Sequence, residues 1–574
     1  MASDDSEKTA WWKFKYFFKL YWKIIFTITW NLLLSSLFLG NNSLVSKCYY
    51  VFNLMAGYWV TQCLPLGMTS LLPLLLFPCL GILSIRDTGA CYINDATMIL
   101  IGGFILATAI EDSNLHMRIA LKVIQVFSYN HYSLLSGVIL VTYFLSMWIT
   151  STAATSMMVP IVLAVLGGLE REGIGRVFIN TENLENPNGQ PIPTDLTTTY
   201  LMGTAYAAML GGSSTLVGSP SNLAFKGIFE KIFVCGPKIG FWQWMMFAVP
   251  FTLVIVVMTV IITFFFMSRQ LNQHNSQSSQ NTGIIGQNRN AMKKVMGEKY
   301  AELGKMTTDE LGVAIMFVLF IILLVTREPG FMPGWASILP GEQIPESASI
   351  LFVSLLMFLI PKDLDFLYVW TNDSNKRPKT SSEGLVTWKS IETRMPWSLL
   401  FLLGAGVALI YGAEVSGMSS ILEKNFKDSL DGQEPDNILS AMLIFVGIVT
   451  NITPDVVTAN IMLLYISCMS TSANLNPLYM VPGALMCSYS FVSSFGSPSI
   501  AIIRSACHVR VKSVILRGLG PAILIYFLLP IFYTNFGAKY VYLDGTQSVD
   551  WSNKTLITEN ELITNTCDQS IVPP

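Results

Sequence analysis

Long apolar stretches separated by short polar ones run through almost the whole chain. Several of them reach the ~20 apolar residues that a helix needs to cross a bilayer. The clearest lie at residues 242–267, 311–325 with their flanks, and 514–536. Near the start of the chain the same pattern predicts three spans, at residues 16–39, 48–65 and 69–85. It predicts an all-α polytopic membrane protein with about 11 transmembrane segments.

Two apolar segments are interrupted in a way that favours re-entrant hairpins. In the first, residues 95–127, the apolar part 98–110 is too short to cross and ends at a polar tip. The tip consists of Glu111, Asp112, Ser113 and Asn114. The second hairpin starts at Pro396 and tips at Gly412 and Glu414. A short buried helix followed by a loop is the alternative interpretation of the first segment.

Four further breaks place Gly, Ser, Thr or Pro inside apolar sequence, where they are poor material for an uninterrupted helix. Two of them, residues 150–156 and 453–455, interrupt the apolar stretches 134–168 and 438–469. The other two form a near-repeat, VGSPSN at residues 217–222 and FGSPSI at 495–500. In lipid, broken helix survives only against protein or around a watery site. Because hairpin, interrupted helix and second interrupted helix occur in the same order twice, the sequence predicts an inverted-repeat transporter with broken helices around a midplane site.

The breaks supply groups that bind ions. Half-helix N-termini attract anions, whereas carbonyl and hydroxyl oxygens attract small hard cations such as sodium. Residues 150–152 with 218–222, and 453–456 with 496–500, are therefore predicted as two halves of one site. The alternative is that these small residues only permit tight helix packing.

Composition agrees with a membrane protein and excludes several other classes. Of the 574 residues 52% are hydrophobic and 13% charged, with a mean hydropathy of +0.51, whereas soluble domains average about 25% charged residues. The nine cysteines and four histidines form no metal-spaced cluster, and neither an HExxH nor a Walker motif occurs. We therefore expect no metal, no cofactor, no nucleic-acid partner and no enzymatic activity, with Na+ or H+ as the coupling ion.

Charge and sequons predict the orientation in the membrane. Lysines precede the first apolar run and no small-residue cleavage site follows, so we expect no cleavable signal peptide and a cytosolic N-terminus. The polar, basic residues 268–308 are predicted as a disordered cytosolic linker. Asn41 and Asn553 begin glycosylation sequons, and an odd number of crossings places both outside. Residues 539–574 are then an extracellular tail of a multi-pass cell-membrane protein.

The run SMWITSTAATSMMVP at residues 146–160 resembles the divalent anion:sodium symporters, which include sodium/dicarboxylate, citrate and sulfate cotransporters. NLHMRIAL at 114–121, TAYAA at 204–208 and NPLY at 476–479 are similar to the same family. The resemblance covers nearly the whole chain, and length and loop placement are similar to its insect-type, INDY-like branch. It implies a homodimer that moves substrate by an elevator motion. The transport domain would comprise residues 95–230 and 396–508, and the scaffold residues 16–90, 240–395 and 509–538.

The resemblance also implies which residues bind substrate and ions. The substrate-binding residues would be Thr150, Ser151, Thr152, Asp455, Ser497, Pro498 and Arg504. The ion-binding residues would be Ser151, Gly218, Ser219, Asn222, Asp455 and Gly496. The family pattern has asparagine where this chain has Ser151, Asp455 and Ile500. Because three amides that could hold sodium are missing, we expect transport to be largely independent of sodium.

Asp455 is the most informative of these departures, because an ionisable residue in membrane sequence is a functional candidate. It either pairs with Arg504, or is protonated during transport while Arg504 takes a substrate carboxylate. Three functions are compatible with the pattern. The chain carries citrate and succinate-like di- or tricarboxylates with weak sodium coupling, it carries sulfate or another anion, or it is a transport-dead paralogue acting as a membrane scaffold or sensor.

Overall fold

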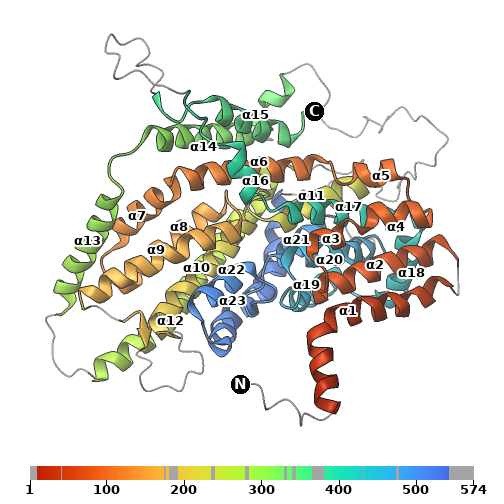
Figure 1. The fold of residues 1–574 in the computed structure, drawn as a ribbon, viewed down its shortest axis with the longest axis horizontal. Helices are drawn as coiled ribbons and strands as arrows, with labels where there is room; N and C mark the ends of the chain where they lie inside the picture. Colours follow the sequence, from red (N-terminus) through yellow and green to blue (C-terminus); the bar gives the residue numbers. More distant parts are fainter. Residues whose placement is uncertain are drawn as a thin grey trace.

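The computed structural model of the chain is almost entirely helical (Figure 1). It describes residues 10–39, 42–173, 176–179, 192–233, 239–277, 284–328, 333–338, 344–364, 381–430, 432–472 and 477–541. Within these ranges two short strands, β1 (Phe178–Ile179) and β2 (Ile192–Pro193), pair antiparallel. The predicted sequons at Asn41 and Asn553, and the tail beyond residue 541, lie outside the described residues.

The first part of the chain forms a series of helices up to residue 127. They are α1 (Ala10–Leu39), α2 (Leu44–Thr61), α3 (Leu66–Ser70), α4 (Leu72–Leu80), α5 (Ile85–Ala90), α6 (Asp95–Asp112) and α7 (Leu115–Phe127). The predicted span 69–85 is divided between α3 and α4, with Pro73 in the first turn of α4, where its missing N–H costs nothing. A reciprocal capping box between Asn94 and Thr97 starts α6.

The first predicted hairpin has its tip in the expected place but differs in length. The helix α6 ends at Asp112, and Asn114, with a φ of 56°, turns the chain into α7. However, α5 and α6 together cover Ile85–Asp112, a stretch long and apolar enough to cross a membrane. The expectation that this apolar arm is too short to cross is therefore wrong, because it considered only the uninterrupted apolar run and not the polar-ended helix around it.

The next four helices form the first broken-helix unit: α8 (His131–Ser146), α9 (Ser151–Arg171), α10 (Asp195–Ser213) and α11 (Pro220–Ile232). Side-chain oxygens of Asn130, Thr150 and Thr194 accept backbone N–H groups and so cap α8, α9 and α10. The helices α8 and α9 pack against each other as a hairpin, and α10 packs against both. The sequence predicted this part only as an interrupted helix. In the structure α8 and α9 form a hairpin whose turn lies inside the molecule.

The middle of the chain contains α12 (Phe241–Gln277), α13 (Ile284–Glu302), α14 (Thr308–Arg327), the 3-10 turn η2 (Trp335–Ser337), α15 (Glu346–Leu359) and α16 (Trp388–Arg394). The expected disorder of residues 268–308 is wrong for most of that range. The helix α13 buries Met292, Val295 and Met296 and packs on α7 and α9. These apolar residues are spaced as one face of a helix, a signal outweighed in the sequence by the polar composition around it.

The second half contains α17 (Trp397–Ser416), α18 (Met418–Leu430), α19 (Pro435–Thr450), α20 (Asp455–Ser472), the 3-10 turn η5 (Pro477–Tyr479), α21 (Met480–Cys487), α22 (Pro498–Cys507), α23 (Val511–Phe532) and the π-helical segment η6 (Tyr533–Val541). The predicted tip at Gly412 and Glu414 is wrong, because α17 continues through both residues. The turn lies at Gly417, whose φ of 79° suits glycine.

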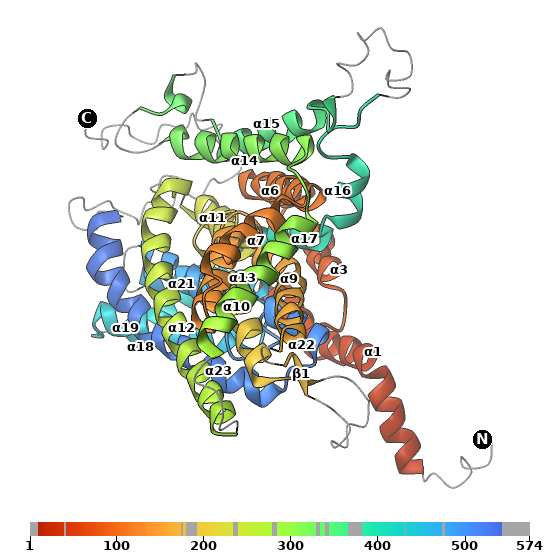
Figure 2. The same ribbon diagram turned by 90° about the vertical axis from the view of Figure 1, so that its left-hand side faces the viewer.

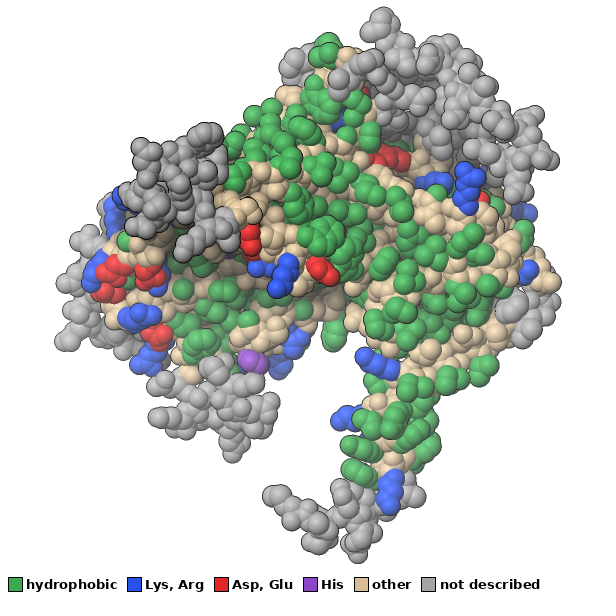
Figure 3. All heavy atoms as spheres, turned by 45° about the horizontal axis from the view of Figure 1, so that its top comes forward, with side chains coloured by type: hydrophobic (Ala, Val, Ile, Leu, Met, Phe, Trp, Pro, Cys, Tyr) green, Lys and Arg blue, Asp and Glu red, His purple; other side chains and the backbone are tan. Residues whose placement is uncertain are grey.

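Six helical stretches of the described chain are long and apolar enough to cross a membrane: Ile85–Asp112, Ser151–Arg171, Phe241–Gln270, Thr308–Arg327, Trp397–Ser416 and Val511–Lys539. Five shorter apolar helical stretches accompany them. On the face viewed in Figure 3, hydrophobic side chains cover most of the surface and charged ones gather in separate groups. Length, composition and surface therefore agree with a polytopic membrane protein.

The two broken-helix units, α8–α11 and α19–α22, pack against each other. The helix α22 of the second unit packs on α9 and α10 of the first, and α11 of the first unit packs on α20 and α21 of the second. The long helices α12 and α23 pack together beside these units, whereas α6 packs on α14, α15 and α17 (Figure 2). Each unit therefore completes its core with the last helix of the other.

Candidate functional site

Four breaks in the helices lie at matching places in the two units. The hairpin turns are residues 147–150 between α8 and α9, and residues 451–454 between α19 and α20. The broken helices are interrupted at residues 214–219, between α10 and α11, and at residues 488–497, between α21 and α22. The second arm after each break starts with a helix N-terminus, and both α11 and α22 carry proline in their first turn.

In each unit a glycine of the broken helix touches the end of the hairpin's first arm. A Cβ atom on Gly218 would lie 2.8 Å from the carbonyl oxygen of Ser146, the last residue of α8. A Cβ atom on Gly496 would overlap the carbonyl oxygen of Thr450, the last residue of α19. No larger residue fits at either position, so each loop lies directly against a carbonyl that ends a helix. Such carbonyls carry the negative end of the helix dipole and favour a cation.

The loop of the first unit is closed by side chains that bind its own carbonyl groups. Thr215 Oγ1 donates to Met147 O at 2.5 Å and accepts Gly218 N at 3.0 Å. Asn222 Nδ2 donates to Thr215 O at 2.8 Å and to Ser213 O at 3.2 Å. Asn222 Oδ1 is buried and has no hydrogen-bond partner among the described residues. Because an unpaired buried acceptor costs ~1–3 kcal/mol, this amide oxygen is a candidate cation ligand.

The loop of the second unit is organised by Asn451, which was not among the predicted site residues. Asn451 Nδ2 donates to Gly447 O at 2.8 Å. Its Oδ1 accepts Val492 N at 3.2 Å and Ser490 Oγ at 3.4 Å. Asn451 thus ties the hairpin turn to the broken helix, as Thr215 does in the first unit through Met147 O. The signal in the sequence was an amide placed directly after an apolar helix, but the residue also matches a sequon.

Two serines at equivalent places connect the units to each other. Ser221 Oγ lies 2.7 Å from Ser488 Oγ, which is also 3.2 Å from Ser219 Oγ. Ser499 Oγ donates to Ser151 O at 3.2 Å. Ser221 and Ser499 are the second serines of the two S-P-S sequences. The near-repeat therefore has a structural meaning that the sequence did not reveal, since each copy binds the opposite unit.

The predicted residues of the first hairpin lie at its turn but in different surroundings. Thr150 Oγ1 accepts Ala153 N at 3.4 Å and so caps α9. Ser151 is half-buried and offers its carbonyl to the second unit, whereas Thr152 is exposed. The structure therefore brings Ser151 to the contact between the units and turns Thr152 away from it.

In the second unit Ser497 caps α22, because its Oγ accepts Ile500 N at 3.4 Å. The same hydroxyl reaches the first unit by donating to Met209 Sδ at 3.3 Å. Pro498 is the first residue of α22, and Ile500 is fully buried and offers no polar group. In the late loop, Gly496 contacts the hairpin of its own unit and Ser497 contacts the first unit. Both residues therefore lie at the predicted site.

Asp455 and Arg504 do not form the ion pair that the sequence suggested. Asp455 is the half-buried first residue of α20, and its Oδ1 accepts Val456 N at 2.9 Å. Within the described ranges no cationic group lies within ion-pair distance of it. Arg504 Nη1 instead donates to Ser494 Oγ at 2.5 Å. The pairing failed because spacing along one helix says nothing about which helix faces the other.

Close to the first broken helix, a buried charge cluster joins α11 to α6, α14 and α15. Lys226 Nζ lies 2.8 Å from Glu230, 3.3 Å from Glu346 and 3.6 Å from Asp95. Arg327 Nη1 lies 3.5 Å from the other oxygen of Glu346. The side chains of Lys226 and Glu346 are each only 5% exposed. Sequence reasoning missed this cluster, because its members are far apart along the chain.

Taken together, the breaks offer carbonyl, hydroxyl and amide oxygens beside the N-termini of four helices. Oxygen ligands suit hard cations, and helix N-termini suit carboxylates or other anions. Within the described ranges no group of three His, Cys, Asp or Glu residues could hold a metal ion. The oxygen atoms and helix N-termini together are suited to holding a small anion with a small cation.

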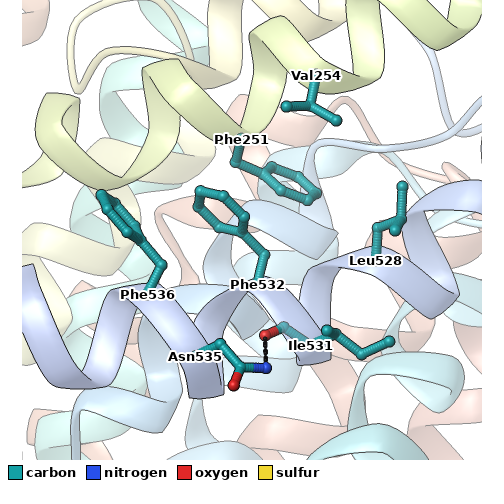
Figure 4. Close-up of a pocket in the computed structure, with 7 residues that line it drawn as sticks. All are labelled: Phe251, Val254, Leu528, Ile531, Phe532, Asn535 and Phe536. Atoms are coloured by element: carbon teal, nitrogen blue, oxygen red, sulfur yellow. Dashed lines mark hydrogen bonds between the residues drawn. The ribbon is translucent and has the colours of Figure 1, made fainter.

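A cavity of about 190 Å³ lies elsewhere, between α12 and α23. It is lined by Phe251, Val254, Leu528, Ile531, Phe532, Asn535 and Phe536 (Figure 4). Its one amide, Asn535, donates back to Ile531 O of its own helix at 2.9 Å. With no charged group this cavity has nothing to hold an anion, so it is not part of the site.

Comparison with known proteins gives consistent matches over nearly the full length. The family model described as the sodium:sulfate symporter transmembrane region matches residues 14–542. The chain is 34% identical to the Drosophila melanogaster protein I'm not dead yet, over 93% of this chain and 92% of that protein. It is 30% identical to human Na(+)/dicarboxylate cotransporter 3, over 82% and 85% of the two chains. It is also 30% identical to the rat Na(+)/citrate cotransporter, over 96% and 99%.

Proposed function

The chain belongs to the sodium:sulfate symporter family, a family of multi-pass membrane transporters and not of enzymes, and on this premise we propose that it carries di- or tricarboxylates such as citrate or succinate across a membrane. The resemblance seen in the sequence is thereby confirmed. Support for carboxylates comes from similar proteins named as dicarboxylate and citrate cotransporters. Sulfate is the alternative substrate, since the family description names it.

The observation that carries this proposal is the matching construction of the two units. Each unit places a helix N-terminus and hydroxyl groups at the contact with the other, through Ser221 with Ser488 and Ser499 with Ser151. Two helix N-termini at this contact suit an anion with two or more carboxylates, since each contributes roughly half a positive charge. The substrate would lie between the turns at Thr150–Ser151 and Pro454–Asp455, with Ser497 and Arg504 beside it.

The coupling ion is proposed to sit in the first unit. Its candidate ligands are the Asn222 amide oxygen, the Ser146 carbonyl beside Gly218, and the polar groups of Ser151 and Ser219. In the second unit the Asn451 amide is already satisfied within the loop, and Ile500 provides no oxygen. We therefore propose a second cation position in this unit, formed by Asp455 and Gly496, in which Asp455 takes a proton in place of sodium. For this reason we expect sodium to contribute weakly to transport.

The moving part is proposed to comprise the two interlocked units. Transport domain boundaries at residues 95–230 and 396–508, with a scaffold at 16–90, 240–395 and 509–538, stay predictions. The helix contacts place α12 against the first unit through α10. They place α6 between the first unit and α15, because α6 packs on both α11 and α15, and they place α17 against both units through α11 and α20. We further propose that the units move against the scaffold in an elevator motion. The protein would be a homodimer in the cell membrane with a cytosolic N-terminus.

Uptake of radiolabelled citrate, succinate and sulfate into proteoliposomes tests the proposal. Each substrate is measured with sodium, with choline in its place, and over a series of pH values. We expect carboxylate uptake to exceed sulfate uptake and to persist in choline. Sulfate uptake alone would replace the substrate, and a collapse in choline would refute the weak sodium coupling. No uptake of any substrate by a folded dimer would favour a scaffold or sensor.

A further inference from the structure

The first half of α1 stands clear of the rest of the molecule. Every residue from Trp11 to Ile24 is exposed, and Figures 1 and 2 both show these turns projecting away from the body. Packing on α2 begins only further along the helix. There Tyr58 Oη donates to Thr27 O at 3.1 Å, and Trp30 Nε1 donates to Asn53 O at 3.2 Å.

The exposed half of α1 has two different sides. Phe14, Phe17, Phe18 and Tyr21 are spaced i, i+3, i+4 and i+7, so they share one side of the helix. Their rings contact each other, with centroids 4.6 Å apart for Phe14 and Phe18 and 4.9 Å apart for Phe17 and Tyr21. Each of the four is more than 40% exposed. A connected aromatic strip of this kind is not stable in water and requires an apolar surrounding.

Three lysines lie on the opposite side of the same turns, where the stacked rings of Trp12 and Tyr16 also lie. Lys15, Lys19 and Lys23 are spaced by four residues and so lie on one side of the helix. No Asp or Glu occurs anywhere from residue 8 to residue 86, so no nearby acid of this part of the chain neutralises them. Figure 3 shows lysine or arginine groups set between hydrophobic ones along the projecting helix. The lysine side is therefore positively charged and suited to an anionic partner.

The lysines place this half of α1 at the edge of the bilayer. In Figure 1 the first turns of α1 leave the line of the part that packs on α2, and α1 is not among the six described stretches that are long and apolar enough to cross a membrane. Because a lysine is costly in hydrocarbon, Lys15, Lys19 and Lys23 hold these turns at the interface with water. Aromatic and lysine side chains together are typical of the headgroup region.

We propose that residues 11–24 of α1 form a docking surface for anionic phospholipid headgroups of the leaflet at which α1 enters the membrane. The aromatic strip lies at the boundary with the acyl chains, and Lys15, Lys19 and Lys23 bind headgroup phosphates and carboxylates. A lysine near an anionic leaflet strengthens membrane association by about fivefold, so three lysines strengthen the association of this segment by a factor on the order of 100. This surface holds α1 at one depth in the membrane, independently of which substrate is carried.

The test uses the full-length protein in nanodiscs of phosphatidylcholine alone or with phosphatidylserine added. Hydrogen exchange of the amides at residues 11–24 is measured by mass spectrometry. We expect exchange to slow by tenfold or more when phosphatidylserine is present. The triple variant Lys15→Gln, Lys19→Gln, Lys23→Gln should lose this difference, and the triple Lys→Arg variant should keep it. Lys424→Gln with Lys427→Gln, on exposed positions of α18, is the matched control and should behave as wild type.

Two results would overturn the proposal. Equal exchange in both nanodiscs, or a lipid effect that survives in the triple Lys→Gln variant, would show that the lysines do not bind headgroups. Protection that appears in phosphatidylcholine nanodiscs holding two copies of the chain, but not in those holding one, would show that a second copy covers this surface. A shared gel-filtration profile of all variants excludes misfolding as the cause of either result.

Discussion

Replacing Lys226 by methionine tests whether the buried charge cluster holds α11 in place. Lys226 lies within 4 Å of three carboxylates, those of Glu230, Glu346 and Asp95. Methionine has a similar length, so packing changes little, but Glu346 then keeps only Arg327, at 3.5 Å, as an ion-pair partner among the described residues, together with the backbone N–H of Phe241 at 2.7 Å. Removing one partner of a buried ion pair costs about 3–5 kcal/mol. The partial exposure of Asp95 and Glu230, at 19% and 32%, lets water screen them, so we expect about 3 kcal/mol.

The assay is denaturant unfolding of the purified protein in detergent, followed for Lys226→Met, Glu346→Gln, Glu230→Gln and the double variants. A loss of about 3 kcal/mol lowers the folded-to-unfolded ratio by roughly 150-fold. Glu346→Gln should cost more than Glu230→Gln, because Glu346 is buried and Glu230 forms an i,i+4 pair that solvent reaches. Lys226→Met combined with Glu346→Gln should cost less than the sum of the two. Lys299→Met, which breaks a surface pair with Glu302, is the control and should cost under about 1 kcal/mol.

The reasoning would be refuted by a specific pattern. If Lys226→Met matched the Lys299→Met control, the cluster would contribute nothing that water does not replace. If Glu230→Gln destabilised more than Glu346→Gln, burial would not be the factor that decides the energy. A strictly additive double variant would show that Lys226 and Glu346 do not interact in the folded protein.

Three further predictions concern the breaks. Gly218→Ala and Gly496→Ala should each abolish uptake, because the added Cβ would meet a helix-ending carbonyl. The control Gly167→Ala in α9, where a Cβ meets nothing within 4 Å, should transport normally. Equal uptake by all three variants would contradict the close approach. Asn222→Ala should abolish uptake at unchanged surface expression, since the loop loses its two amide hydrogen bonds and the candidate cation its ligand, while Asn437→Ala on the exposed start of α19 should not; normal uptake by Asn222→Ala would remove it from the site. Sulfate uptake should rise as the pH falls from about 8 to 5.5, because protonation of Asp455 relieves its repulsion of the anion, and Asp455→Asn should flatten that response; a response that survives unchanged in the variant would identify another group.

The positions of the breaks could be predicted from the sequence because they depend on local chemistry. Proline lacks an N–H and glycine accepts unusual backbone angles, so a helix ends near these residues wherever it lies. The prediction failed where a helix contains a glycine without ending there. The helix α17 continues through Gly412, and the chain turns at Gly417 instead. It failed again for α13, because polar composition outweighed three buried apolar residues.

The contacts within the site could not be predicted, because they join residues that are distant in sequence. Ser221 and Ser488 are separated by 267 residues, and nothing in either local sequence identifies its partner. The ion pair expected between Asp455 and Arg504 failed for the same reason. Asn451 was a different case, since an amide directly after an apolar helix is visible in the sequence, but the predicted break began two residues later, at Thr453.

The reciprocal packing of the two units also affects how the protein is made. Ser221 is synthesised 267 residues before Ser488, and ribosomes add about 5–20 residues per second. For roughly 15–50 seconds α11 therefore has its N-terminal serine hydroxyls and polar loop without the opposite unit that completes them. During that time the insertion machinery or lipid headgroups must shield these groups from hydrocarbon. A chain that stops after the first unit would keep this exposed half-site permanently, which is the kind of surface that membrane quality control recognises.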